Sequence, residues 1–271
     1  MKKWIIRIGL GLLIVLGVFV AAIAGIIAWD AFFPSQQATD FTNVTYPGAD
    51  GVTLNGYFTR PDGPGPFPAV LMVHEFFGIN GDIIKKADLL AQQGYAVLAV
   101  DAYRGKTTSQ IPRAIWLVSA TPQEQIAADI DAGYRYLAGL PEVDPSRIAS
   151  AGFCFGGTQV MKLATRNPDL AATAIFYGSG PIADPAALGV MDQGGPVLGI
   201  YGAEDSSIPL EEVRAFELAM QARGVENTVT VYPGVGHAFV HYDTLIVPGA
   251  AQDAWNQMLV FFKENLPAPE S

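Results

Sequence analysis

The sequence predicts an α/β fold in which a mostly parallel sheet carries helices on both faces, preceded by one N-terminal transmembrane helix. Three observations support this prediction. Short apolar runs alternate with segments of helical spacing through most of the chain. The 271 residues, half of them apolar, suffice for one large core, and no internal repeat divides them. The first thirty residues differ in composition from everything that follows.

The N-terminal residues have the composition of a membrane span. Residues 8–29 form a run of 22 uncharged residues, enough for one helix across a hydrocarbon core. Lys2, Lys3 and Arg7 precede this run, and the positive-inside rule then keeps the N-terminus in the cytoplasm. We therefore expect a single-pass membrane protein whose catalytic domain is exported to the periplasm or the extracellular space.

A cleaved signal peptide is the alternative, because the tripeptide AIA at 22–24 resembles a small-residue cleavage site. The apolar run continues past that site, so we favour an uncleaved anchor over residues 1–30. The polar, aperiodic segment PSQQATD predicts a linker within 31–40, and the folded domain is expected over 41–267. The single cysteine suits an oxidising compartment, since it has no internal disulfide partner.

Within the domain, continuous apolar runs predict strands buried on both faces, led by a more antiparallel hairpin that contains VTLNGYFTRP. Thr121 before Pro122, with Glu124 at the third position, predicts the start of a helix, and Gly224 predicts the end of another. The predicted strands lie at 68–74, 95–101, 147–153, 171–178 and 195–202, and the predicted helices lie at 81–94, 121–140, after Gly156, at 209–224 and at 251–265.

Charge and ligand patterns argue against two classes of partner. The net charge of −10, without any cluster of lysine and arginine, argues against nucleic acid. His237 and His241 have the spacing of metal ligands, but no third ligand cluster accompanies them, so we expect no metal.

The only cysteine, Cys154, lies in a glycine-rich turn. The motif GFCFGG at 152–157 follows the predicted strand RIASA and precedes a helix, which matches a nucleophile elbow with cysteine in the serine position. The helix N-terminus that follows is expected to favour a thiolate. A lone cysteine is usually buried and inert, but this context predicts a displayed nucleophile.

A thiol nucleophile needs a base, and the chain has three histidines. His237 lies in YPGVGHAF, just past a late strand, in a glycine-rich loop that can bring its imidazole over Cys154; we interpret His74 and His241 as less suited. Asp205 directly follows a strand in LGIYGAEDSSIP and can hold the imidazole tautomer. The order nucleophile, acid, histidine is that of α/β-hydrolases.

Together, the motifs VHEFFG, GFCFGG, GAEDSSIP and GVGHAF resemble, in this order, the dienelactone hydrolase family, and the resemblance extends from about residue 41 over nearly all of the remaining chain. The resemblance implies the α/β-hydrolase fold, with Cys154 as nucleophile, His237 as base and Asp205 as orienting acid.

The same resemblance implies three further roles. Glu75 would lie beside the resting thiol, and the backbone amides of Phe76 and Phe155 would form an oxyanion hole. A carboxylate near the thiol disfavours a premature thiolate by like-charge repulsion, which would protect an exported thiol from oxidation.

The chain departs from the family where substrate is bound. Bacterial dienelactone hydrolases are similar in gripping the substrate carboxylate with arginines, one of them four residues after the catalytic histidine, where this chain has His241. Arg104 lies close to the position of the other arginine, so we count Arg104, its neighbour Tyr103 and His241 as candidate substrate contacts. Histidine lacks the fixed charged fork of arginine, which makes dienelactone itself a doubtful substrate. Aromatic residues that suit an apolar acyl or alcohol group are Phe76, Phe77, Phe153, Phe155, Tyr103, Trp116 and Phe239.

The expected function is cleavage of small-molecule carboxylic esters or lactones through a thioester intermediate, without a cofactor and by a monomer. Two alternatives remain at this point. One is a non-catalytic exported binding protein that retains the fold, and the other is a peptidase or acyltransferase that uses the same triad.

Overall fold

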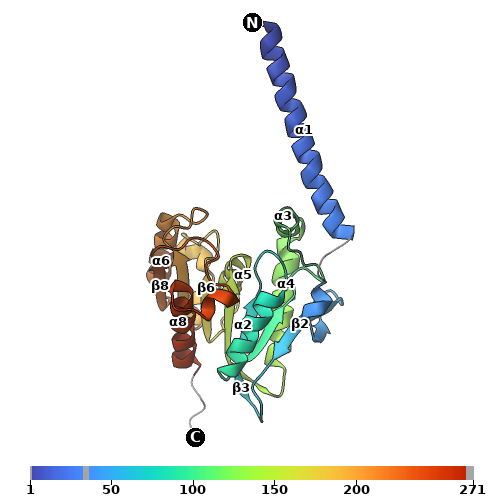
Figure 1. Cartoon of the computed structure of the whole chain (residues 1–271). Coiled ribbons are helices and arrows are strands. Elements are labelled where there is room, and N and C mark those ends of the chain that lie inside the picture. Colours follow the sequence, from blue (N-terminus) through green and yellow to red (C-terminus); the bar gives the residue numbers. More distant parts are fainter. Residues whose placement is uncertain (1, 33–36, 267–271) are drawn as a thin grey trace.

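Runs rich in apolar and β-branched residues, such as FPAVLMV and AVLAV, pair side by side into one sheet. In the computed structural model, which describes residues 2–32 and 37–266, this sheet has eight strands in the order β1-β2-β4-β3-β5-β6-β7-β8 (Figure 1). The strands are β1 (Val44–Pro47), β2 (Thr53–Thr59), β3 (Phe67–Val73), β4 (Ala96–Val100), β5 (Val143–Phe153), β6 (Ala172–Phe176), β7 (Val197–Gly202) and β8 (Asn227–Tyr232).

The pairing confirms a mostly parallel sheet with an antiparallel start. β2 pairs antiparallel with both β1 and β4, whereas all neighbours from β4 to β8 are parallel. Val73 is in register with Val100 on one side and with Gly152 on the other. The carboxyl ends of these strands therefore meet at one edge of the sheet, where side chains from distant segments can converge.

Helices cover both faces of the sheet, as expected. Apolar side chains of α4, α5 and α6, such as Ile130, Val160 and Phe216, form the core on one face. Those of α2 and α8, such as Leu90 and Met258, form the core on the other. The helices are α1 (Lys2–Phe32), α2 (Gly81–Gln92), α3 (Ile111–Ala120), α4 (Gln123–Ala138), α5 (Phe155–Ala164), α6 (Leu210–Arg223), α7 (Tyr242–Leu245) and α8 (Ala250–Asn265), with 3₁₀ turns η1 (Ala38–Phe41), η2 (Pro185–Leu188) and η3 (Met191–Gln193).

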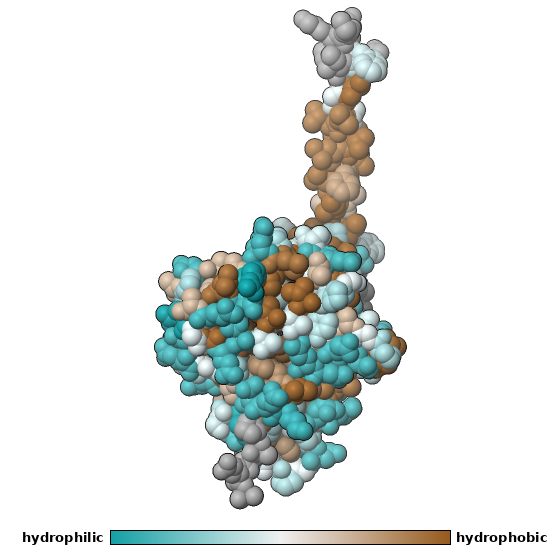
Figure 2. All heavy atoms as spheres, turned by 90° about the vertical axis from the view of Figure 1, so that its left-hand side faces the viewer, coloured by the Kyte–Doolittle hydropathy of each residue, from teal (hydrophilic) through white to brown (hydrophobic). Residues whose placement is uncertain are grey.

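The N-terminal helix α1 projects away from the domain (Figure 1). Most of its apolar side chains are exposed, among them Leu12, Leu13 and Phe19, so they do not belong to the core of the domain, and Figure 2 shows the helix as a brown column. The segment Ile8–Asp30 is long and apolar enough to cross a membrane, a test that a signal sequence also passes. An exposed apolar helix of this length is stable in an apolar environment, such as a bilayer, and not in water.

Three local features of the structure differ from what the sequence indicated. Thr121 does not cap α4: its hydroxyl donates to the carbonyl of Leu117, 2.7 Å away, at the end of α3, and Pro122 is the residue that precedes α4. The helix α3 itself was not predicted. In the expected linker, residues 33–36 lie outside the described residues, and Ala38 is buried against the core, so the folded part starts before Phe41.

Candidate active site

The carboxyl ends of five parallel strands bring the chemically important side chains to one edge of the sheet. Each follows directly on its strand or lies in the loop that comes after it, which is why residues more than 150 positions apart in the chain become neighbours. The residues so placed are His74 and Glu75 after β3, Cys154 after β5, Tyr177 after β6, Asp205 after β7 and His237 after β8.

Cys154 lies in a sharp turn between β5 and α5, with φ at 54° and ψ at −113°. A non-glycine residue at positive φ is uncommon, and here the strained backbone displays the thiol. Gly152 and Gly156 make this turn possible: a Cβ on Gly152 would clash with the carbonyl of Gly156, and one on Gly156 would clash with the carbonyl of Val73. The predicted elbow is therefore present, and its glycines serve close backbone packing.

Cys154, His237 and Asp205 form one chain of polar contacts. His237 Nε2 lies 3.1 Å from Cys154 Sγ, and His237 Nδ1 lies 2.7 Å from Asp205 Oδ2. Since a carboxylate only accepts, Nδ1 carries the proton and Nε2 is free to take one from the thiol. The other oxygen of Asp205 accepts the backbone amides of Ser207 and Ile208, at 2.8 and 3.2 Å, which fixes the carboxylate beside the ring.

The thiol opens into a cleft of about 620 Å³. Its wall is largely apolar. The polar side chains in the wall come from α3, α4, α5 and the loops after β6, β7 and β8. The lining residues are Phe76, Ile115, Val118, Ser119, Gln123, Cys154, Phe155, Thr158, Gln159, Lys162, Ser179, Gly180, Ser207 and His237. A cleft of this size and composition admits a small apolar molecule with one or two polar groups.

Two backbone amides favour negative charge at the same place. The backbone N–H groups of Phe155 and Phe76 face the Cys154 sulfur and act to lower its pKa. Phe155 is the first residue of α5, so its N–H belongs to the unpaired donors of a helix N-terminus. Donors in this position can also stabilise an oxyanion that forms on a carbonyl attacked by the sulfur.

The thiol is nevertheless held protonated. Burial raises the pKa of Cys154 to about 11, and the negative charge of Glu75 is the next cause, ahead of the opposing amides. The helix N-terminus does act in the expected direction, since the amide of Phe155 lowers the pKa of Cys154. Burial and the nearby carboxylate outweigh the helix end.

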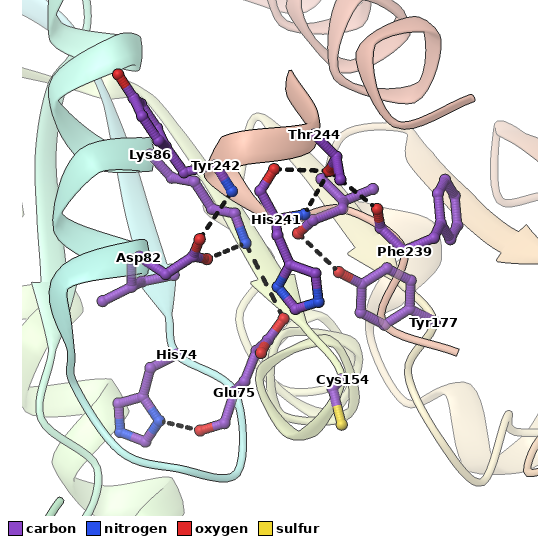
Figure 3. A network of polar contacts seen from close by, with 12 residues as sticks. His74, Glu75, Asp82, Lys86, Cys154, Tyr177, Phe239, His241, Tyr242 and Thr244 are labelled. Atoms are coloured by element: carbon purple, nitrogen blue, oxygen red, sulfur yellow. Dashed lines mark hydrogen bonds and ion pairs between the residues drawn. The ribbon is translucent and has the colours of Figure 1, made fainter. Parts of the chain in front are cut away.

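Glu75 belongs to a buried charge network that the sequence did not predict (Figure 3). Lys86 on α2 is fully buried; its Nζ lies 2.7 Å from Asp82 Oδ2 and 4.0 Å from Glu75 Oε1. The ammonium also lies over the ring of Phe153, 4.2 Å from its centroid. Glu75 Oε1 has no hydrogen-bond partner among the described residues, so Lys86 is the nearest cation that compensates its charge.

His74 holds the turn that carries Glu75 and Phe76. Its Nε2 accepts the backbone N–H of Ala102 at 3.1 Å, so the proton is on Nδ1, which donates to the carbonyl of Glu75 at 2.6 Å. Burial lowers the pKa of His74 to about 4, which keeps the ring neutral. His74 thus positions the turn and does not reach the thiol.

The three candidate substrate contacts lie outside the cleft's described lining. Both Nε and Nη2 of Arg104 bind the carboxylate of Asp129, at 2.7 and 2.8 Å, and Nη1 lies 3.0 Å from Asp50, so the guanidinium is already neutralised. Tyr103 is buried and packs its ring on His74. His241 precedes α7 on the far side of Glu75 from the turn of His74 (Figure 3). The candidate contact Arg104 therefore does not form the arginine grip of the family, in line with the departure that the sequence indicated.

Lys86 and Tyr177 are site residues that sequence reasoning missed. Tyr177, at φ 39°, packs the edge of its ring against His237 and donates to the carbonyl of Val240. Lys86 could have been found, because it lies three residues after Ile83 on the apolar face of α2, where a lysine is out of place. No group of three or more histidine, cysteine or acidic side chains that could hold a metal occurs in residues 2–32 and 37–266.

Comparisons with known proteins show which proteins this chain is similar to. The sequence profile of the dienelactone hydrolase family matches residues 54–266. A candidate carboxymethylenebutenolidase from Yersinia pestis is 32% identical over 241 residues, which cover 82% of this chain and 89% of the relative. The crystal structure of a candidate dienelactone hydrolase from Klebsiella pneumoniae superimposes with a TM-score of 0.70 at 31% identity, covering 82% of this chain and 100% of that one. A dienelactone hydrolase-like promiscuous phosphotriesterase from metagenomic libraries gives 0.71 at 26% identity, covering 82% and 97%.

Proposed function

Because this chain belongs to the dienelactone hydrolase family, and is therefore a hydrolase, we propose that it cleaves carboxylic esters or lactones through a thioester on Cys154. The observation that carries the proposal is the contact chain from Sγ to His237 Nε2, at 3.1 Å, and from Nδ1 to Asp205, at 2.7 Å. Family membership favours this reading over a non-catalytic binding protein.

Acylation begins when the thiol proton moves to His237 Nε2 as Sγ attacks the ester carbonyl carbon. The carbonyl electron pair moves onto oxygen, and the backbone N–H groups of Phe76 and Phe155 donate hydrogen bonds to this oxyanion. Asp205 stabilises the imidazolium. The intermediate collapses, the carbon–oxygen bond breaks, and the leaving alkoxide takes the proton from Nε2, so that an alcohol departs and a thioester remains.

Deacylation repeats these steps with water. His237 Nε2 takes a proton from water while the oxygen attacks the thioester carbonyl, and the sulfur leaves with the proton held by the imidazolium. The acid is released and the thiol is restored. In the resting site, burial and, second, the negative charge of Glu75 keep the thiol protonated, so the nucleophile forms when His237 and a bound carbonyl are both in place.

Kinetics of the full-length protein on a p-nitrophenyl ester test the triad. Cys154→Ala and His237→Ala should each lower kcat/KM by about a thousandfold or more, and the double variant should lose little beyond that, because triad members act as a unit. Cys154→Ser should retain little activity. Activity of Cys154→Ala close to that of the unmodified chain would contradict the proposal.

The N-terminal helix supports a proposal about location. With Lys2, Lys3 and Arg7 ahead of the span, α1 would anchor the protein with its N-terminus in the cytoplasm and its domain exported. Full-length protein should then stay with membranes through a high-salt wash, since apolar transfer and not charge retains it. Release of a shortened soluble form beginning near Gly25 would show instead that the segment is a cleaved signal peptide.

A further inference from the structure

The carboxyl end of α1 is joined to the segment that leads into α3. Asp30, the last residue of the apolar span, is buried, and its carboxylate accepts the hydroxyl of Thr108 at 2.6 Å. Thr108 lies three residues before α3, and α1 packs against α3. If the span Ile8–Asp30 is in a bilayer, its surface lies within a few residues of the start of α3 (Figure 1).

The helix α3 is apolar on both sides. Ala114 and Leu117 face the core, whereas Ile111, Ile115 and Trp116 are 58%, 56% and 51% exposed. Arg113 is the only charged residue in this ten-residue helix, which is too short to span a membrane. Two exposed isoleucines beside a tryptophan are the composition of a helix that lies in the lipid interface. In Figure 2, hydrophobic surface gathers on the end of the domain nearest α1.

The same helix forms a wall of the cleft. Ile115, Val118 and Ser119 line it together with Cys154 and His237. Ile115 is both a lining residue and more than half exposed, so it stands at the rim. A bilayer in contact with the outer face of α3 would therefore reach the mouth of the cleft.

We propose that the outer face of α3, formed by Ile111, Ile115 and Trp116, rests in the membrane interface, and that the substrates are amphiphilic carboxylic esters that enter the cleft from the bilayer. This inference rests on the proposed ester hydrolysis and names its substrate class. The occupant of the apolar face is the lipid surface, because α1 holds α3 beside the membrane it would span.

Kinetics with two kinds of ester test the proposal on full-length protein in phosphatidylcholine vesicles. Ile111→Gln/Trp116→Gln changes two exposed positions, and neither lines the cleft, although the sequence suggested Trp116 as an aromatic substrate contact. We expect kcat/KM for water-soluble p-nitrophenyl acetate to stay within about twofold, and turnover of a long-chain ester dissolved in the vesicles to fall roughly tenfold or more, since each buried apolar side chain is worth at least that factor. The matched control, Leu218→Gln/Val260→Gln on α6 and α8, should change neither rate.

Lipid contact is measured directly by fluorescence. In a Trp4→Phe/Trp29→Phe background, Trp116 is the exposed tryptophan that remains, because Trp255 is buried. Shallowly brominated phosphatidylcholine should quench its emission. Unquenched emission, or equal loss on both esters, would overturn the proposal, and so would protection of Trp116 by a second copy of the chain. Failure of ester hydrolysis itself is distinguishable, because p-nitrophenyl acetate would then not be cleaved either.

Discussion

Replacing Glu75 by glutamine should make the Cys154 thiol more acidic and more reactive at neutral pH. Glutamine keeps the size of the side chain and removes its charge. The pKa of Cys154, raised to about 11 from an ordinary value of 9.0, leaves roughly one thiol in ten thousand ionised at pH 7, against roughly one in a hundred without the shift.

Burial is the largest cause of this shift, and the charge of Glu75 is the second. Two like charges about 5–8 Å apart at an effective dielectric constant of about 40 repel by about 1–2 kcal/mol, or roughly one pKa unit. Because removing a negative charge stabilises the thiolate, Glu75→Gln should lower the pKa of Cys154 by that amount. At pH 7 to 8 this gives roughly tenfold more thiolate.

The rate of alkylation by iodoacetamide, measured on full-length protein from pH 6 to pH 10, reports the thiolate fraction. The Glu75→Gln profile should lie at lower pH than that of the unmodified chain. Glu204→Gln, which removes an exposed carboxylate next to Asp205, is the matched control and should leave the profile unchanged. Alkylation of Glu75→Gln no faster than the unmodified chain would refute the idea that this carboxylate restrains the thiol.

Three further predictions concern Lys86, His74 and the charge of the substrate. Lys86→Met should lower the free energy of unfolding by about 3–5 kcal/mol, because it leaves the carboxylates of Glu75 and Asp82 without their buried cation. Denaturant unfolding should show partial recovery in Lys86→Met/Glu75→Gln and no loss in the control, Lys85→Met, which changes an exposed lysine. His74 has a folded pKa of about 4 and an unfolded value of 6.5, so its contribution is complete above pH 6.5 and is lost as pH falls toward 4, by about 3 kcal/mol in total; His74→Asn should lack this slope between the two pH values. A neutral ester should have a higher kcat/KM than a carboxylate-bearing lactone of similar size, because no arginine lines the described cleft. Lys162 is the cation in that lining, so a strong preference for the acidic substrate that persists in Lys162→Met would contradict this prediction.

Much of the site followed from sequence because its signals are local. The glycines around Cys154 are needed because a Cβ at Gly152 or Gly156 would clash with a neighbouring carbonyl, and this requirement is visible in the sequence. The order of the strands then brings Asp205 and His237 to the same edge of the sheet. Sequence reasoning failed where tertiary partners decide the outcome. Arg104 pairs with Asp129, 25 residues later, instead of reaching the cleft. The sequence around Arg104 does not indicate that Asp129 is its partner.

Two other elements were missed for different physical reasons. The short helix α3 has only ten residues, opens with Pro112 at its second position and carries apolar side chains at exposed as well as buried positions, so its sequence does not stand out as a surface helix. Lys86 broke the rule that lysines are exposed, because Asp82 and Glu75 supply opposite charges in the interior.

The most direct measurement of the central claim is the intact mass of the full-length protein during turnover of a slowly hydrolysed ester. We expect a transient mass increase equal to the acyl group. The adduct should lie on the peptide that contains Cys154, and hydroxylamine should remove it, because it is a thioester. His237→Ala should form this adduct far more slowly, and Cys154→Ala should not form it. Turnover at the full rate with no adduct on Cys154, or an adduct that persists in Cys154→Ala, would contradict nucleophilic catalysis by this thiol.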